Sequence, residues 1–330
     1  MNAAVRGQHG FTLAEIAIAL IVLSLLTVFV MDQVGPMLQF QAELATRGKL
    51  ADLKQALQSA YRDNAASIDN DEQARLVLAA GTIDPAGGDA RGRCSSSAAT
   101  FAPIARYASQ STGAVFRDGG GAPLCVLITP RLTQIIAGVQ VSYHSVAFVA
   151  TGWNNRLDTV AGCGTTGLSA AGVLTVCGDD EGVLIDGLAI AAENFRQSSA
   201  RMEKIAQAYQ SYFQTRFESD PARDVSVDYF ASSGTPAQRW DGGGAMPSTG
   251  CAGAVPLVAA TGVSPHTVLG LSSTDVTDAY GQVIQLDNCS DRTRNPNNAT
   301  AALQAPPYTA LLQTTLPGGA LLQLSVVGTF

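Results

Sequence analysis

An uninterrupted apolar segment lies near the start of the chain, and a helical repeat of apolar positions follows it. Residues 11–31 carry one charge, on Glu15, and at ~1.5 Å per residue they reach about 30 Å, enough to cross the hydrocarbon core of a membrane. Further along, apolar side chains recur at helical spacing at Leu50, Leu53, Leu57 and Tyr61. We therefore predict a long helix over residues 11–63, transmembrane over 11–31 and amphipathic beyond, with one face on a sheet.

Gly35 and Pro36 interrupt this helical pattern shortly after the apolar segment. A proline inside a helix removes one backbone hydrogen bond and kinks or locally opens the chain. We predict a helix break at these two residues.

The helical pattern returns in the second half of the chain. Residues 49–61 align with residues 201–213 at a constant offset of 152. Gln55, Ala56, Gln58 and Ser59 recur as Gln207, Ala208, Gln210 and Ser211. Each helix is followed by a stretch rich in Gly, Ser and Pro, and then by apolar strands, at 123–129, 139–151 and 172–176 in the first case and at 282–286, 308–315 and 321–327 in the second. This order favours an α+β fold with antiparallel sheets in two tandem lobes, residues 64–186 and 187–330.

The composition describes a weakly charged surface. Charged residues make up 14% of the chain, against a usual share of about a quarter, and the net charge is −7. A protein that binds nucleic acid is expected to carry a basic patch or stripe, and the sequence has none. We expect no nucleic-acid partner.

Six dispersed cysteines follow the apolar segment, and none forms a C-x-x-C pair: Cys94, Cys125, Cys163, Cys177, Cys251 and Cys289. An even number of cysteines behind an export signal indicates disulfides formed in an oxidising compartment. The repeat favours Cys94–Cys125 and Cys251–Cys289 as corresponding pairs. Cys163–Cys177 is then the third.

The junction before the apolar segment is unusual for a signal sequence. Arg6 precedes the segment and no acidic residue does, so the N-terminal flank is expected to stay cytoplasmic while the body is exported. An ordinary signal peptide is cut after its apolar stretch, whereas the distinctive Gly10-Phe11 junction lies before it. A carboxylate inside a membrane span costs roughly 2.5–3.5 kcal/mol, which indicates a functional role for Glu15.

The motif Gly-Phe-Thr-Leu-Ala-Glu at residues 10–15, followed by an apolar helix, resembles the signal of type IV prepilins and type II secretion pseudopilins. The resemblance implies that residues 1–10 are a cytoplasmic leader, and that a membrane prepilin peptidase cuts after Gly10 and methylates Phe11. It also implies that Glu15 neutralises the N-terminal amine of a neighbouring subunit when the helices pack. The motif covers little more than the apolar segment, and the leader has Gln-His where the family often has Lys or Arg.

The resemblance further implies a precursor in the bacterial inner membrane with a periplasmic globular region, later part of an extracellular pilus or a periplasmic pseudopilus. Other pilin subunits are the expected partners, through their N-terminal helices. In this family the helix often loosens on assembly near the position of Gly35 and Pro36; a simple kink at the membrane surface is the alternative. Because two lobes are bulky for a slender filament, we expect a minor or tip subunit that primes assembly or displays an adhesive lobe. A pseudopilin, an adhesin module on a pilus tip and a plain signal anchor are the alternatives.

An acidic loop is the candidate metal site. Asp158, Asp179 and Asp180 resemble a pseudopilin loop whose carboxylates and carbonyls bind calcium, a hard cation that prefers oxygen ligands. A solvated acidic loop is the alternative. The sequence lacks a G-x-S-x-G motif and a phosphate-binding loop, and His144 lies in an apolar strand where a hydrogen-bonded structural histidine is expected. We expect no enzymatic activity.

Overall fold

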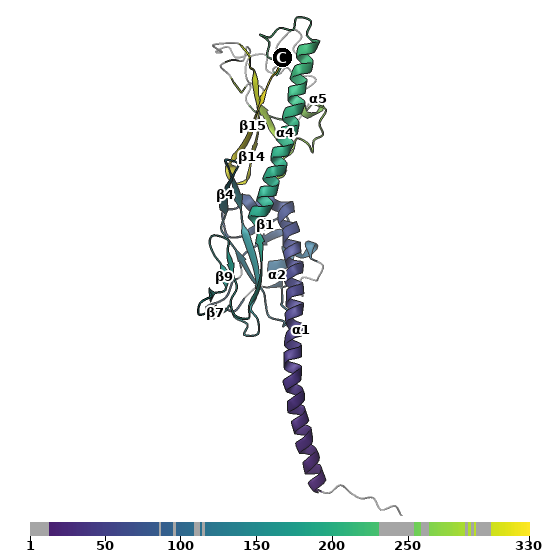
Figure 1. Ribbon diagram of the computed structural model, residues 1–330, viewed down its shortest axis with the longest axis vertical. Helices are drawn as coiled ribbons and strands as arrows, with labels where there is room; N and C mark the ends of the chain where they lie inside the picture. The colour runs from purple at the N-terminus through teal and green to yellow at the C-terminus, as the bar shows by residue number, and fades with distance from the viewer. Residues whose placement is uncertain are drawn as a thin grey trace, which may run out of the picture.

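In a computed structural model of the chain, a long N-terminal helix leads into two lobes that lie one beyond the other along its direction (Figure 1). The description covers residues 13–85, 87–94, 97–108, 113, 116–230, 254–258, 264–287, 290, 291, 294 and 305–330. The predicted cleavage junction at Gly10 and Phe11, and the predicted bridge between Cys251 and Cys289, lie outside these residues.

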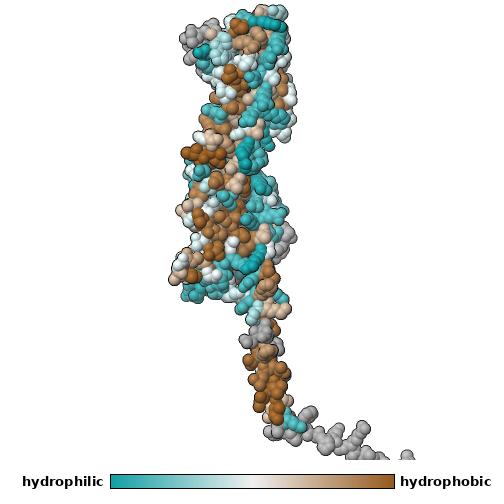
Figure 2. Space-filling model, in the orientation of Figure 1, coloured by the Kyte–Doolittle hydropathy of each residue, from teal (hydrophilic) through white to brown (hydrophobic). Residues whose placement is uncertain are grey.

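The helix α1 (Leu13–Asn70) has two parts with different surroundings. The first part, over residues 15–29, projects from the lobes and is apolar on all sides. We call this part the stem, and Figure 2 shows it as a brown column. Farther along, its apolar positions are 2% exposed or less at Leu50, Leu53, Leu57 and Tyr61, as their spacing predicts. A helix that is apolar on every side needs lipid or other helices around it.

The helix continues through Gly35 and Pro36, so the predicted break is absent from this structure. One proline removes one hydrogen bond, and the other bonds of this helix of 58 residues hold its course. Helical geometry is lost instead at Asn64 (φ −124°, ψ 17°), beside the predicted helix end. There the Asn64 side chain donates to the Ala60 carbonyl (2.7 Å) and accepts from the Ala79 amide (2.8 Å). Loosening of the Gly35 region on assembly stays a prediction.

The first lobe (residues 64–186, with the buried part of α1) is built on an antiparallel sheet of order β11-β6-β3. These strands are β3 (Cys125–Ile128), β6 (Ser145–Ala150) and β11 (Glu181–Asp186), and α1 packs against β11. Shorter elements surround them: β1 (Leu76–Leu78), β2 (Gly81–Ile83), α2 (Ala98–Phe101), η1 (Ala102–Tyr107), β4 (Leu132–Ile136), β5 (Val139–Tyr143), β7 (Thr159–Val160), β8 (Gly164–Thr165), β9 (Gly167–Leu168) and β10 (Leu174–Thr175). Every residue of the central strand β6 is buried, which makes it the middle of this lobe's core.

The second lobe (residues 187–330) begins with the helix α4 (Gly187–Ser219), which packs against β15. Its antiparallel sheet has the order β12-β13-β14-β15. The elements are β12 (Val255–Pro256), α5 (Pro265–Val268), β13 (Gln285–Asp287), β14 (Thr309–Thr315), η2 (Pro317–Gly319) and β15 (Leu321–Val327). The α+β fold class is therefore confirmed: long helices cover antiparallel sheets.

Part of the strand order and several contacts of the first lobe recur in the second. The strand orders β3-β6-β11 and β13-β14-β15 correspond, and a glycine turn precedes the first strand of each set. This turn docks on its helix in the same way twice: the Gly119 amide donates to Thr46 Oγ1 (2.9 Å), and the Ala279 amide donates to Ser198 Oγ (3.1 Å). Thr46 and Ser198 are related by the offset of 152 residues that the sequence repeat has.

A second pair of contacts obeys the same offset. Lys49 Nζ donates to the Arg117 carbonyl (3.1 Å), and Arg201 Nη1 donates to the Thr277 carbonyl (2.6 Å). Each cation donates a hydrogen bond to a carbonyl oxygen of the corresponding turn. The repeat therefore includes the helices and also the contacts that attach the turns to them.

Candidate functional site

The stem of α1 is the first candidate site. Among the described residues, one helix is long and apolar enough to cross a membrane, with a mean hydropathy of 2.3 over its best 18-residue window. The Ser24 and Thr27 hydroxyls donate to the carbonyls of Ile21 (2.8 Å) and Leu23 (2.7 Å), so these polar groups need no water. Glu15 lies exposed in the first turn of the helix.

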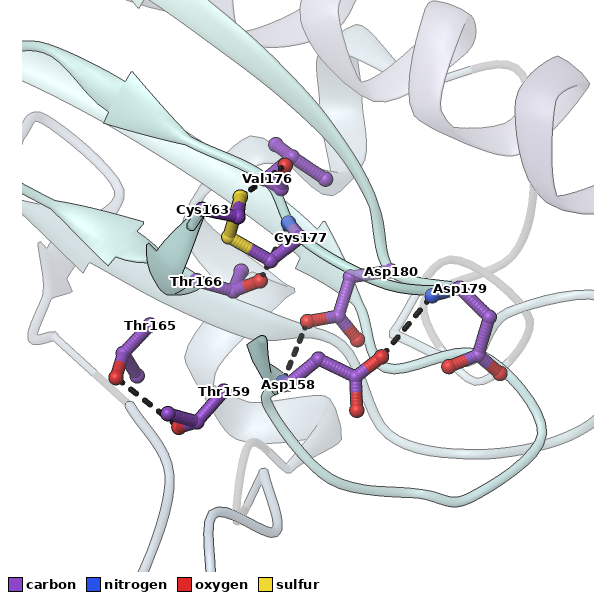
Figure 3. The surroundings of a disulfide bond; sticks show 9 residues. All are labelled: Asp158, Thr159, Cys163, Thr165, Thr166, Val176, Cys177, Asp179 and Asp180. Carbon is purple, nitrogen blue, oxygen red and sulfur yellow. Dashed lines mark hydrogen bonds between the residues drawn. A yellow bond between two sulfur atoms is a disulfide. The ribbon is translucent and has the colours of Figure 1, made fainter. Parts of the chain in front are cut away.

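The second candidate site is the acidic loop that connects β6 with β11. Carboxylate oxygens of Asp158, Asp179 and Asp180 lie within 4.8 Å of one another. The disulfide between Cys163 and Cys177 joins the two halves of this loop beside them (Figure 3). The structure thus brings together the three residues that the sequence suggested as calcium ligands.

Backbone amides hold these carboxylates in place. The Asp158 amide donates to Asp180 Oδ2 (2.8 Å), the Asp179 amide to Asp158 Oδ2 (3.0 Å) and the Trp153 amide to Asp179 Oδ2 (2.7 Å). Asp180 is 6% exposed, and its Oδ1 has no hydrogen-bond partner among the described residues. Figure 3 shows the Asp158 and Asp180 carboxylates turned toward each other. A buried carboxylate oxygen that lacks a hydrogen-bond partner suits a bound cation.

The neighbouring carboxylates differ in their titration. Burial raises the pKa of Asp180, while the hydrogen bond from the Asp179 amide holds the pKa of Asp158 below its usual range.

The loop also depends on two glycines with positive φ, Gly152 (54°) and Gly178 (64°). A side chain at Gly152 would overlap the Asp179 carboxylate, and one at Gly178 would overlap the Asp158 carboxylate. The chain therefore closes tightly around these acids.

A pocket of about 250 Å³ separates the acidic loop from α1. Its lining joins α1, the turn before β3 and both ends of the loop, and includes Glu43, Arg47, Asp118, Trp153, Asp180 and Glu181. Arg47 Nε donates to Glu181 Oε1 (2.7 Å), while Glu181 Oε2 is buried without a partner among the described residues. Sequence reasoning missed this pocket because its walls come from segments far apart along the chain.

The predictions for the cysteines and for His144 have clear outcomes. The structure has the predicted disulfides Cys94–Cys125 and Cys163–Cys177, each worth roughly 2–4 kcal/mol of stability. His144 lies between β5 and β6 and is fully buried, with Nδ1 2.8 Å from the Thr129 carbonyl and Nε2 3.0 Å from the Asp71 carbonyl. It is a hydrogen-bonded structural histidine, as predicted.

No protein-family model, curated protein or solved structure matches this chain. The architecture supports a broad conclusion: a long, apolar N-terminal helix packs on antiparallel sheets, which is consistent with a pilin-like protein. The apolar helix and the two disulfides indicate a membrane-associated protein whose lobes lie outside the cytoplasm.

Proposed function

We propose that the chain is a type IV pilus subunit, a minor or tip pilin, that assembles through its N-terminal helix and displays its two lobes for priming or adhesion. The observation that carries this proposal is the stem of α1, apolar on all sides and projecting from the lobes, with one carboxylate near its start (Figure 2). Such a surface is stable in the inner membrane before assembly and among neighbouring helices afterwards.

The role of Glu15 follows from the cost of burying charge. In a bundle of apolar stems, the Glu15 carboxylate and the amine of a neighbour's Phe11 are both desolvated, and each is tolerated because the other is there. Since the second lobe lies beyond the first on the side away from the stem, the subunit extends farther from its stem than a subunit with one lobe would (Figure 1). This shape favours a minor or tip position.

A pseudopilin of a type II secretion system is the second candidate. The acidic loop favours it, because the proposed calcium ligands resemble a pseudopilin loop. An adhesin module on a pilus tip is compatible with the first proposal, with the second lobe as the binding part.

Processing by a prepilin peptidase tests the proposal. When the chain is co-expressed with an active peptidase, intact-mass measurement is expected to find a protein that begins at N-methylated Phe11. Gly10→Val is expected to block this cleavage while the chain still inserts in the membrane. A wild-type chain that keeps residues 1–10 beside an active peptidase would contradict the proposal.

We also propose that Asp158, Asp179 and Asp180 bind calcium. Millimolar calcium is expected to raise the melting temperature of the purified protein by several degrees, since a ligand that binds the folded state alone stabilises it by about 2.7 kcal/mol at 100 times Kd. Asp180→Asn is expected to abolish the shift, whereas Asp224→Asn, at an exposed position of the second lobe, is expected to keep it. An equal calcium response in Asp180→Asn would refute the site.

A further inference from the structure

We call the end of each lobe nearer the stem its base, and the opposite end its far end. The base of the second lobe packs against the far end of the first lobe. The Gly318 amide in η2 donates to Asn70 Oδ1 (2.9 Å), where α1 ends. Gly187, the first residue of α4, packs so closely on the first lobe that a Cβ there would overlap the Tyr61 hydroxyl and the His144 carbonyl. Three elements form this base: the start of α4, the turn at 277–282 and the connection between β14 and β15.

The internal repeat assigns a counterpart to each of these elements in the first lobe. The start of α4 corresponds to α1 from Gly35 to Arg47, the turn at 277–282 to that at 117–122, and the β14–β15 connection to the acidic loop between β6 and β11. These counterparts are the elements that line the pocket of about 250 Å³. Gly120 and Ala42 line that pocket in the first lobe. The second lobe has Tyr280 and Asn194 at the corresponding positions.

The corresponding helix faces differ sharply in burial. Ile190 and Ala191 of α4 are 6% and 0% exposed, because the first lobe covers them. Their counterpart Leu38 on α1 is 58% exposed, and Gln39 is exposed too. The first lobe therefore has a surface whose counterpart in the second lobe is covered, and none of the described residues covers it in the first lobe.

The charge of the pocket indicates what kind of surface fits it. Glu43, Asp118 and Glu181 line it next to the acidic loop, and Arg47 is the one cation among its described lining residues. Glu181 Oε2 is buried and has no hydrogen-bond partner among the described residues. A Lys or Arg side chain entering the pocket would give this oxygen a donor and offset the negative charge.

We propose that the base of the first lobe receives the far end of a pilin-like lobe from a different subunit, and that this end inserts a basic side chain beside Glu43 and Glu181. A second copy of this chain suits the pocket poorly, since the far end of its second lobe, residues 216–228, has Arg216 and Arg223 against Glu218, Asp220 and Asp224 on its surface. The proposal rests on the proposed function as a filament subunit.

Photo-cross-linking of the full chain in cells tests the proposal. A photoreactive p-benzoylphenylalanine replaces Trp153, which lines the pocket and is 46% exposed, and the same group at Ile135, 69% exposed on the β4–β5 hairpin, is the control. The expected product at position 153 links it to a basic peptide from the far end of another pilin-like subunit, identified by mass spectrometry. Chain that is present in filaments but gives no cross-link, a cross-link to a second copy, or the same product from position 135 would overturn the proposal. Absence of the wild-type chain from filaments would instead overturn the proposed function itself.

A charge reversal gives an independent measure. Glu43→Lys is expected to lower incorporation into filaments at least about tenfold, because the new cation would repel the basic side chain that the other subunit inserts in the pocket. Glu203→Lys makes the same change of charge at an exposed position of α4 and is expected to incorporate normally. Equal incorporation of the two variants, with both chains processed at Phe11, would overturn the proposal and leave the filament role intact.

Discussion

Glu15→Ala is expected to remove the chain from filaments while leaving it processed and in the inner membrane. Without the carboxylate, the N-terminal amine of a neighbouring subunit would be buried unpaired among apolar stems, which costs about 2–5 kcal/mol. That cost corresponds to a loss of incorporation of at least about 30-fold. Insertion in the membrane is expected to improve, because a charged group has left the span. The measurement is the ratio of the chain in sheared filaments to the chain in membranes.

Ser24→Ala is the matched control on the same stem. Ser24 donates to the Ile21 carbonyl within its own helix, so its loss leaves no charge unpaired, and wild-type incorporation is expected. If Glu15→Ala assembled as well as Ser24→Ala, the carboxylate would have no role in assembly. The plain signal anchor would then be the better account of the N-terminal segment.

Asp69→Asn is expected to stabilise the protein by about 4 kcal/mol at pH 7. Asp69 is fully buried where the two lobes meet, and it accepts a hydrogen bond from the Tyr61 hydroxyl (2.5 Å). Burial raises the pKa of Asp69 from 3.8 to about 8, although the Tyr61 hydrogen bond works in the other direction. Asparagine has nearly the same shape, keeps the acceptor for Tyr61 and does not ionise.

The pH dependence shows whether burial of Asp69 is the cause. Below about pH 4, the folded and unfolded chains both hold the proton, and Asp69 contributes no penalty. Between about pH 4 and pH 8, the unfolded chain loses the proton and the folded chain keeps it, so the free energy of unfolding falls by ~1.4 kcal/mol per pH unit. Denaturant unfolding in detergent, with the disulfides intact, is expected to show equal stability of wild type and Asp69→Asn at pH 3.5 and a gap that widens toward pH 8.

Asp71→Asn is the control with the opposite sign. Burial works against ionisation of Asp71, but the Gln73 amide and Arg75 prevail and hold its pKa below the ordinary value. Its contribution to stability is therefore present above pH 4 and lost as the pH falls through the lowered pKa, so Asp71→Asn is expected to destabilise at pH 7. A gap between wild type and Asp69→Asn that stayed constant from pH 3.5 to pH 8 would show that Asp69 ionises as freely in the folded protein as in the unfolded one.

Much of the fold was predictable because it depends on local patterns. The spacing of Leu50, Leu53 and Leu57 fixed the face of α1 that the sheet covers, and the predicted strand at 321–327 coincides with β15. The repeat between 49–61 and 201–213 predicts a second helix, and residues 201–213 lie in α4.

The errors have physical reasons. The strand β11 (Glu181–Asp186) was missed because its first residue continues a run of acids that is typical of a loop, and pairing with β6 overrides that preference. Helical hydrogen bonds on both sides of Pro36 hold α1 together where a break was predicted. The pocket beside Glu181 and the buried Asp69 arise from contacts between distant segments, which no pattern of neighbouring residues records.

Quantitative mass spectrometry of filaments sheared from cells, compared with membranes, tests the central claim most directly. The filament fraction is expected to contain this chain in trace amounts relative to the main subunit, with an N-terminal peptide that begins at methylated Phe11. A large amount would make it the main subunit, and processed chain confined to the membrane would favour a pseudopilin. Chain that is absent from filaments and unprocessed in the presence of an active prepilin peptidase would contradict the account.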